Sequence, residues 1–382
     1  MRRRRHRRAH AVDTIARLRL DSLSLRVGDG RYSRDVSKGK RNREERRRAS
    51  VARRHHLVSR FYLNRFADDH ERLAAIRGGT GATHVASTEK LCAQVDFYSY
   101  IDVEGEKSGE LEMFLAKFES EAAPAFERIA SAPTATPSED DRALILNFIA
   151  FQVGRGRYFR HQYNALADFG YKLMLSFESK DRDEARERLR YLTGRDPDDE
   201  ELAVWLETLE KPDDYVIEPH SNESLMAGLQ VGAEMLDSLA ARPWIVLRMG
   251  EPILITSDEP VTLWNRQRPE DAFYGRGIAN SDEVRLPLDQ HHMLVLTLEE
   301  PPKRKGAVPP LFARDMNRLT ASSANEWVFA HPSNADLSVV AQWAGEAPPR
   351  ALRANVFGEE KTIEPRPPLS RSLAVRPKQA GS

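Results

Sequence analysis

The charges of this chain are divided between two regions of opposite sign. Residues 1–54 contain 20 Arg and Lys against 6 Asp and Glu, a net charge of +14, whereas the remaining 38 basic and 52 acidic residues give −14. A basic block of this kind repels itself and stays extended unless a polyanion neutralises it. The basic arm therefore contributes nothing to a core, and the folded part is expected to begin near residue 55.

Three interpretations of the arm stay open. It is a disordered tail, or a stretch added by an upstream translation start; it is a non-specific nucleic-acid arm; or it is a targeting peptide. Tyr32 is the only aromatic residue before Phe61, so the base stacking typical of single-strand binding has little support. A secretory peptide needs an uninterrupted apolar stretch of roughly 7–15 residues, and charged side chains break residues 11–27 five times.

The composition excludes three classes of protein. Apolar residues make up 40% of the chain, which is enough for a sizeable core and excludes wholesale disorder. The longest apolar candidate, Ala143–Val153, falls short of the roughly 18–20 residues of a membrane span. The single cysteine, Cys92, excludes an internal disulfide framework and a Cys-based zinc site. Since Arg outnumbers Lys 46 to 12, as in GC-rich bacterial genes, we expect a soluble, cytoplasmic bacterial protein.

Short strands, then helices, then short strands follow one another, which predicts an α+β fold rather than alternating α/β. Strands are expected at 73–76, 95–101, 244–249, 252–256, 284–288, 293–298 and 327–330, and helices at 110–131, 139–177, 181–192, from 197, 221–241 and 314–325. A kink is expected at the Gly154/Gly156 pair, and Gly250-Glu251 indicates a hairpin. We predict one mostly helical domain with a small, largely antiparallel sheet at 55–345, between the basic arm 1–54 and a loose Pro/Arg-rich tail at 346–382.

One face of the long predicted helix mixes polar and apolar residues. Ile145, Phe148, Gln152, Arg155 and Phe159 are spaced by 3, 4, 3 and 4 residues, so they share a face. A buried Arg is costly unless an anion or acceptor groups satisfy it. Arg155 therefore either clamps a carboxylate or phosphate, with Gln152 orienting that ligand, or forms a structural ion pair with an internal acidic residue.

A second candidate lies where the predicted strand Ile253–Thr256 ends, at Asp258. Strand ends often carry functional side chains, because the sheet fixes the position while the loop leaves the side chain accessible. Asp258 is a candidate general base, metal ligand or partner of Arg155; the structural alternative is an Asx-type turn in which it bonds its own backbone. We predict that Arg155 and Asp258 lie close together.

Two adjacent histidine pairs, His55-His56 and His291-His292, complete the set of candidate groups. Neighbouring side chains in a strand point in opposite directions, so each pair offers at most one group to a given site. Each is either a ligand or acid–base group, or an ordinary surface or core histidine. The sequence contains no HExxH, GxSxG, Walker or GxGxxG pattern, so no metal site is predicted and the cofactor is left open.

Several short blocks resemble those of a known family. The block His56–Phe66 resembles the opening His-x-x-Pro-x-x-Tyr-Leu-x-x-Phe pattern of the domain of unknown function 4238 (DUF4238) family, and Asp96–Tyr98 resembles its next block. The helix with Gln152 and Arg155 resembles its central Gln-x-x-Arg segment. Thr256–Val261 resembles its Ser-Asp-Asn-Pro-Val block, and Met316–Arg318 with Trp327–Ala330 resembles its closing Asn-helix-strand element.

The resemblance covers roughly residues 55–335 and departs from the pattern at two positions. Ser59 stands where the pattern usually has proline, and Glu259 where it usually has asparagine. The family has no established activity, so the resemblance implies the boundaries of the domain more than its function.

These residues predict one polar site built from His56, Gln152, Arg155, Asp258 and Asn317. The residue types suit an anionic small molecule or nucleic acid, with Arg155 as clamp, His56 or Asp258 as catalytic acid or base, and Gln152 and Asn317 as binding groups. A hydrolytic or phosphodiester-cleaving reaction fits this set. The alternative is a non-enzymatic binding or structural protein in which the same residues form a buried stabilising network. A pocket open to solvent favours the first hypothesis, and a closed, fully paired cluster favours the second. The oligomeric state is left open.

Overall fold

A computed structural model describes residues 54–95, 98, 100–101, 107–213, 215–217, 219, 221–266, 277–301, 307–346, 352–356 and 359–363. The chain divides into two compact units. Unit 1 comprises the described residues up to 157 and those of 225–349, and unit 2 comprises those of 158–224 and 350–382. The basic arm before Arg54 lies outside the described residues, so its predicted disorder and nucleic-acid binding stay predictions.

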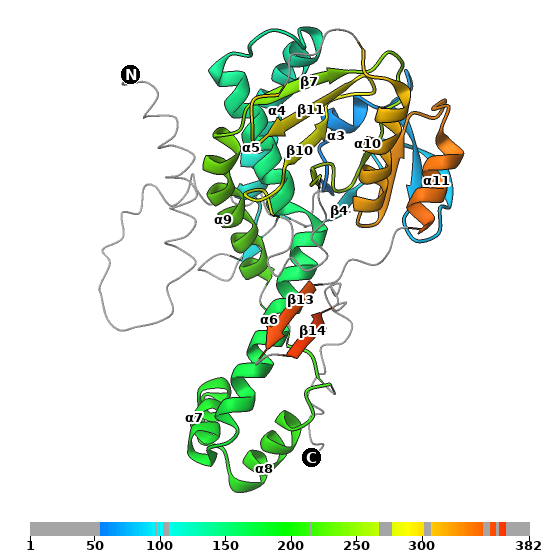
Figure 1. The fold of residues 1–382 in the computed structure, drawn as a ribbon. Helices are drawn as coiled ribbons and strands as arrows, with labels where there is room; N and C mark the ends of the chain where they lie inside the picture. The colour runs from blue at the N-terminus through cyan, green and yellow to red at the C-terminus, as the bar shows by residue number, and fades with distance from the viewer. Residues whose placement is uncertain are drawn as a thin grey trace, which may run out of the picture. The chain divides into compact units, whose positions relative to one another are not determined.

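Unit 1 contains two four-stranded sheets, and the first has the order β7-β11-β10-β9 with antiparallel neighbours throughout (Figure 1). Its strands are β7 Trp244–Arg248, β9 Thr262–Trp264, β10 Glu283–Pro287 and β11 His292–Thr297. Four consecutive residues of β10 and four of β11 are buried, so these strands are covered on both faces. This burial explains why their sequences are almost continuously apolar instead of alternating.

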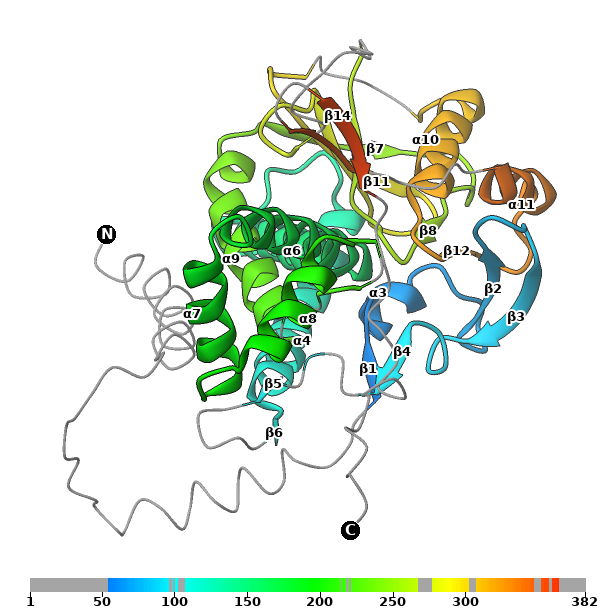
Figure 2. The ribbon, with the colours of Figure 1, turned by 90° about the horizontal axis from the view of Figure 1, so that it is seen from below.

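The second sheet has the order β3-β2-β12-β8, and Figure 2 shows β2 and β3 side by side. Its strands are β2 Arg72–Arg77, β3 Thr83–Ser87, β8 Thr256–Ser257 and β12 Trp327–Ala330. A glycine-containing turn at residues 78–81 joins β2 to β3. Gly79 and Gly81 have φ of 75° and 67°, which L side chains rarely adopt, and a Cβ on Gly81 would lie 2.6 Å from the carbonyl oxygen of Ala341. This turn therefore requires glycine.

The helices of unit 1 pack on these sheets and on one another. They are α3 Arg60–Asn64, α4 Glu110–Ser131, α5 Glu139–Arg155, α9 Ser221–Ala240, of which residues from 225 belong to unit 1, α10 Pro310–Ser323 and α11 Leu337–Glu346. The Ser138 hydroxyl caps α5 by accepting the N–H of Asp141. The main core joins side chains of α3, α4 and α5 to both sheets, with Tyr62, Phe126, Phe148 and Phe329 fully or almost fully buried.

Unit 2 is mainly helical. It contains α6 Arg157–Glu178 from residue 158 onward, α7 Arg182–Thr193, α8 Asp199–Leu209, and the antiparallel pair β13 Leu352–Val356 and β14 Glu359–Ile363. Gly194 ends α7 in the left-handed conformation, and Asp198 and Glu201 form a capping box at the start of α8. The pair β13–β14 lies in the tail that was expected to be loose. The sequence did not predict these two strands, because their short alternating pattern is too weak a signal.

The α+β fold class is confirmed, whereas one predicted pairing is wrong. Two further antiparallel pairs complete the described strands: β1 Arg54–His56 with β4 Ala93–Val95, and β5 Tyr100–Ile101 with β6 Lys107–Ser108. The predicted hairpin at Gly250-Glu251 does not form, because β7 pairs with β11 and β8 pairs with β12. A local turn signal does not determine the partner when a strand distant in sequence offers a better match.

Candidate functional site

Gln152 and Arg155 lie on the buried side of α5, as their helical spacing predicts. Their exposed fractions are 1% and 3%. The Nε2 of Gln152 donates to the carbonyl oxygen of Leu57 at 3.1 Å, and its Oε1 accepts from Nη2 of Arg155 at 2.9 Å. The two side chains thus fasten α5 to the segment that directly follows His56.

The guanidinium of Arg155 finds its counter-ion on α4. Its Nη1 donates to Oε1 of Glu119 at 2.8 Å, its Nη2 donates to Oγ of Ser59 at 3.0 Å, and its carbon lies 5.9 Å from the ring centre of Tyr98. Burial opposes the charge, but Tyr98 and Glu119 more than offset it, so the pKa of Arg155 is raised. The Nε is buried and has no hydrogen-bond partner in the described part of the chain.

Asp258 follows β8 and is 5% exposed. Its Oδ1 accepts the N–H of Asn325 at 2.9 Å, and its Oδ2 accepts the N–H groups of Glu326 at 2.8 Å and Trp327 at 3.1 Å. Burial raises the pKa of Asp258 to about 6, although the three N–H donors act in the opposite direction. Both carboxylate oxygens are therefore used to fasten the end of β8 to the turn before β12. The predicted Asx-type turn, in which Asp258 would bond its own local backbone, is wrong, because the three N–H partners lie 67 to 69 residues further along the chain.

Charged residues of both signs surround Asp258. Arg157, the first residue of α6, forms an ion pair with Glu326, whose backbone N–H bonds Asp258. The carboxylate of Glu259 lies over Gly156, where an added Cβ would meet its Oε1 at 2.6 Å. The helix break at Gly156, which the Gly154/Gly156 pair predicted, thus brings Arg157 to the turn that Asp258 holds.

Cys92 is bonded to the segment that follows His56. Its carbonyl oxygen accepts the N–H of Leu57 at 2.8 Å, next to the bond from Gln152. Burial raises the pKa of its thiol, and the carboxylate of Asp258 raises it further.

Asn317 on α10 has a separate role. Its Oδ1 accepts the N–H of Ile255 at 3.2 Å, and its Nδ2 donates to the carbonyl oxygen of Ile253 at 2.8 Å. The side chain is fully buried. It satisfies the backbone of a buried, irregular segment before β8, which explains why an amide suits this position.

The structure thus brings some predicted site residues together and separates others. Gln152 and Arg155 bond each other. Arg155 and Asp258 form no ion pair with each other, because Arg155 pairs with Glu119 and Asp258 accepts backbone N–H groups. That Arg155 and Asp258 lie close together stays a prediction. The side chain of His56 lies outside the described residues, so its catalytic role stays a prediction.

Two partners of Arg155 were missed by sequence reasoning. Glu119 carried no distinguishing signal, since it is one of many acidic residues on helices. Ser59 did carry one: it stands where the family pattern usually has proline, and proline has no hydroxyl that could accept from Arg155. The departure from the pattern therefore coincides with a contact in the cluster.

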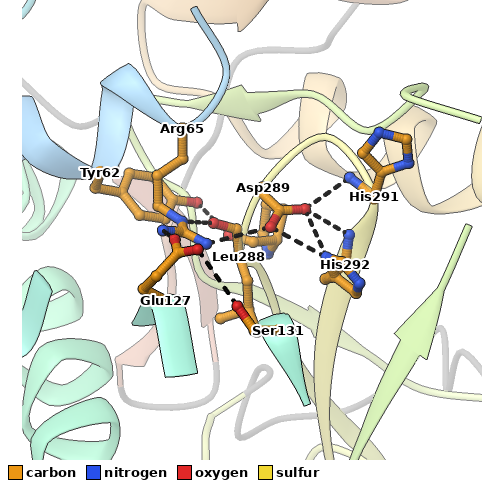
Figure 3. Close-up of polar contacts among 9 residues, drawn as sticks. Tyr62, Arg65, Glu127, Ser131, Leu288, Asp289, His291 and His292 are labelled. Carbon is orange, nitrogen blue, oxygen red and sulfur yellow. Dashed lines mark hydrogen bonds and ion pairs between the residues drawn. The ribbon is translucent and has the colours of Figure 1, made fainter. Parts of the chain in front are cut away.

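A second polar network joins α3, α4 and the β10–β11 turn (Figure 3). Arg65 donates to Glu127 at 2.9 Å and to Asp289 at 3.2 Å. Asp289 accepts the backbone N–H groups of His291 and His292 and contacts Nδ1 of His292 at 2.9 Å. Burial acts to raise the pKa of Asp289, but the contacts with His292 and the N–H groups hold it below its usual value. The ring of His292 joins this network, whereas His291 contributes its backbone.

Two kinds of feature are absent from the described residues. No three His, Cys, Asp or Glu side chains there are grouped in a way that could hold a metal ion. None of the described helices combines the length and the apolar character that crossing a membrane requires.

Comparison with known proteins gives one match. The model of a protein family described as a protein of unknown function, DUF4238, matches residues 54–334. No curated protein and no solved structure matches the chain. The matched range contains all five predicted site residues, and it begins at the first residue of β1.

Proposed function

Since the chain belongs to the DUF4238 family of proteins of unknown function, we propose a function from the geometry: a non-enzymatic binding protein whose polar cluster stabilises unit 1. The polar cluster is defined as Gln152, Arg155, Asp258 and Asn317 with their direct partners. In this proposal its side chains hold α5, β8 and α10 in place, and the surface for a partner lies elsewhere.

The observation that carries the proposal is the way the polar cluster is satisfied. The four side chains are at most 5% exposed. Both polar atoms of the side chain bond protein groups in each of three residues, Gln152, Asp258 and Asn317. A binding site would leave donors or acceptors pointing into a space that a ligand can enter, whereas a closed and paired cluster is typical of a stabilising network.

A hydrolytic or phosphodiester-cleaving reaction has less support. It requires a base or nucleophile within reach of the substrate. Asp258 was one of the two candidate bases, with His56, and three backbone N–H groups occupy the oxygens of Asp258. The Asp258 carboxylate would have to release the turn at 325–327 before it could accept a proton from a substrate.

The surface best suited to a partner is apolar and lies in unit 2. Eight of the 14 exposed large apolar side chains fall within residues 158–224, about a quarter of the described residues. A cavity of about 410 Å³ between α7 and α8 includes Val204 and Trp205 in its lining, and the indole N–H of Trp205 is buried with no hydrogen-bond partner among the described residues. Clustered exposed apolar side chains mark interaction surfaces in soluble proteins.

A cytoplasmic location also remains a prediction, which cell fractionation tests.

A double-mutant cycle on Arg155 and Glu119 tests the structural role of the polar cluster. Removing one partner of a buried pair typically lowers the free energy of unfolding by ~3–5 kcal/mol. Because Glu119 is 23% exposed, we expect a smaller loss of roughly 2–4 kcal/mol for Arg155→Met, measured by urea denaturation. Glu119→Gln should also destabilise, and the double variant should recover part of the loss.

The matched control for this cycle is Arg60→Met. Arg60 pairs with Glu71 at the surface, and the two side chains are 43% and 50% exposed. The substitution should therefore change the free energy of unfolding by less than about 0.5 kcal/mol. If Arg155→Met is as stable as the wild type or more stable, the polar cluster is a functional site rather than a network, since functional sites are often held at a cost in stability.

The unpaired Nε of Arg155 supports a second candidate, the anion site that the sequence suggested. An anion entering beside Tyr98 would accept from this nitrogen and complete the guanidinium's bonding. In this case inorganic phosphate should raise the melting temperature of the wild type but not of Arg155→Lys, because lysine lacks the planar fork. Equal protection of both proteins would contradict the anion site.

A further inference from the structure

The strand β3 forms one edge of the second sheet of unit 1 and pairs with β2 alone (Figure 2). At the end of this pairing the N–H of Thr88 donates to the carbonyl oxygen of Glu71 at 2.9 Å. Backbone groups of an antiparallel strand point alternately toward and away from the neighbouring strand. Counting back from Thr88, the outward N–H and C=O groups therefore belong to Thr83, Val85 and Ser87.

This outer edge of β3 is open. The outward N–H groups of Thr83, Val85 and Ser87 receive no hydrogen bond within the described chain, and the side chain of Val85 is 54% exposed. The opposite edge of the same sheet is closed, because Thr256 and Ser257 of β8 are fully buried. The sheet therefore has one edge to which a further strand can be added.

The open edge carries none of the features that normally protect an edge strand. Charged side chains, proline and β-bulges usually prevent such a strand from pairing with another molecule. Residues 78–88 contain no Asp, Glu, Lys, Arg or Pro, in a chain of which 30% is charged. The register of β3 with β2 runs unbroken over five residue pairs, so no bulge bends the edge away. An exposed edge of this kind is a template for another strand.

The sequence of β3 complements itself. A two-fold axis beside Val85 would place Val85 opposite its counterpart in a second, antiparallel copy of β3, Thr83 opposite Ser87, and His84 opposite Ala86. These are a pair of β-branched residues, hydroxyl pairs and a pair without like charges, all of which suit cross-strand contact. The outward groups of the two strands would then form about six backbone hydrogen bonds.

From this edge we infer that β3 binds β3 of a second copy of the chain, which joins the two sheets into one. The inference goes beyond the proposed function, because this interface lies in unit 1 and not on the apolar surface of unit 2. Because β8 closes the other edge, the pairing ends at two copies and forms no fibre. Each strand has five residues, whereas a standard interface has roughly 20–30 a side, so the dimer is weak and dissociates on dilution.

Sedimentation equilibrium of the full chain over roughly 10–500 µM tests the dimer. The wild type should change from monomer toward dimer within this range. Val85→Lys places like charges opposite each other and should weaken dimerisation at least roughly ten-fold. The matched control is Val204→Lys on α8 of unit 2, where the valine is 59% exposed, and it should leave the dimer intact.

A second variant, Val85→Pro, tests the backbone bonds themselves. Proline removes the outward N–H of Val85 but no bond to β2, and edge strands accept it there. The variant should keep its far-UV circular dichroism and lose the dimer. If Val85→Lys and Val85→Pro both dimerise like the wild type, or if Val204→Lys abolishes dimerisation, the interface is not β3 and the inference is overturned.

Hydrogen exchange followed by NMR locates the interface. The N–H of Val85 should exchange markedly more slowly at the highest protein concentration than at the lowest. The N–H of Ala86 faces β2 and should exchange equally slowly at both concentrations. Equal exchange of Val85 at both concentrations overturns the inference. So does a wild type that stays monomeric throughout, which would leave the edge to a strand of a different protein.

Discussion

Replacing Gly154 by alanine tests the closest helix contact in unit 1. An added Cβ on this residue of α5 would lie 2.0 Å from the carbonyl oxygen of Gly228 on α9, and one on Gly232 would lie 2.9 Å from that of Ala150. An ordinary contact between carbon and oxygen is about 3.3 Å, so the helices would have to separate by roughly 1.3 Å. Because the obstacle is backbone, no side-chain rotation relieves it.

The magnitude follows from two opposing effects. Overpacking of this kind typically costs ~1–3 kcal/mol or more, and separating α5 from α9 also loosens the packing around Phe151, Leu225 and Leu229. Alanine returns about 1 kcal/mol of helix propensity. We expect Gly154→Ala to lower the free energy of unfolding by roughly 2 kcal/mol, which corresponds to a fall of about 4–8 °C in melting temperature for a unit of this size.

The same substitution at Gly170 serves as the matched control. Gly170 lies within α6, is exposed and has open space around it, so Gly170→Ala should gain up to ~1 kcal/mol from helix propensity. Both variants are compared with the wild type by urea and thermal denaturation. If Gly154→Ala is as stable as Gly170→Ala, the close contact between α5 and α9 is refuted.

Two further predictions concern the polar cluster. Burial raises the pKa of Asp258 to about 6 from ~3.9 in the unfolded chain, so the folded protein binds more protons between these values. The contribution of Asp258 to the free energy of unfolding is therefore complete below pH ~4 and is lost as the pH rises through about 6, a fall of roughly 3 kcal/mol. Asp258→Asn should lack this fall. If urea denaturation shows parallel pH dependence for the wild type and the variant, the raised pKa of Asp258 is contradicted. Asn317→Ala should cost ~1–3 kcal/mol because it strands the buried N–H of Ile255, whereas the carbonyl of Ile253 keeps the bond from Asn334, and hydrogen exchange at the N–H of Ile255 should accelerate. Asn147→Ala, whose side chain bonds only within its own helix turn, should leave that exchange rate unchanged.

Local patterns predicted the helices well. The spacing of apolar residues predicted a helix at 110–131, and α4 has these bounds. The glycine pair at 154 and 156 predicted the break that separates α5 from α6 at Gly156. Helix formation depends on neighbours within one or two turns, so the information lies in a short stretch of sequence. The hairpin at Gly250-Glu251 was predicted from the same kind of local signal and is wrong, since strand pairing is decided over long distances.

The partners of the candidate site residues illustrate what could not be predicted from the sequence. The sequence indicated that Arg155 is buried and needs an acceptor, and both statements agree with the structure. It did not indicate that the acceptor is Glu119 rather than Asp258, because any of many carboxylates satisfies a guanidinium equally well. Asp258 is bound by backbone N–H groups 67 to 69 residues away, and a backbone donor has no signature in the sequence.

By itself, the sequence determined the α+β class, most of the helices and the buried face of α5, because periodicity and capping act over short distances along the chain. Only the tertiary structure decided that four of the predicted site residues, Gln152, Arg155, Asp258 and Asn317, are enclosed and bonded, and that Leu166 and Met174 on α6 are exposed. An apolar helical face has the same spacing whether a core or a second molecule covers it. Which of the two covers it depends on the packing of distant segments, and that packing is a property of the folded chain as a whole.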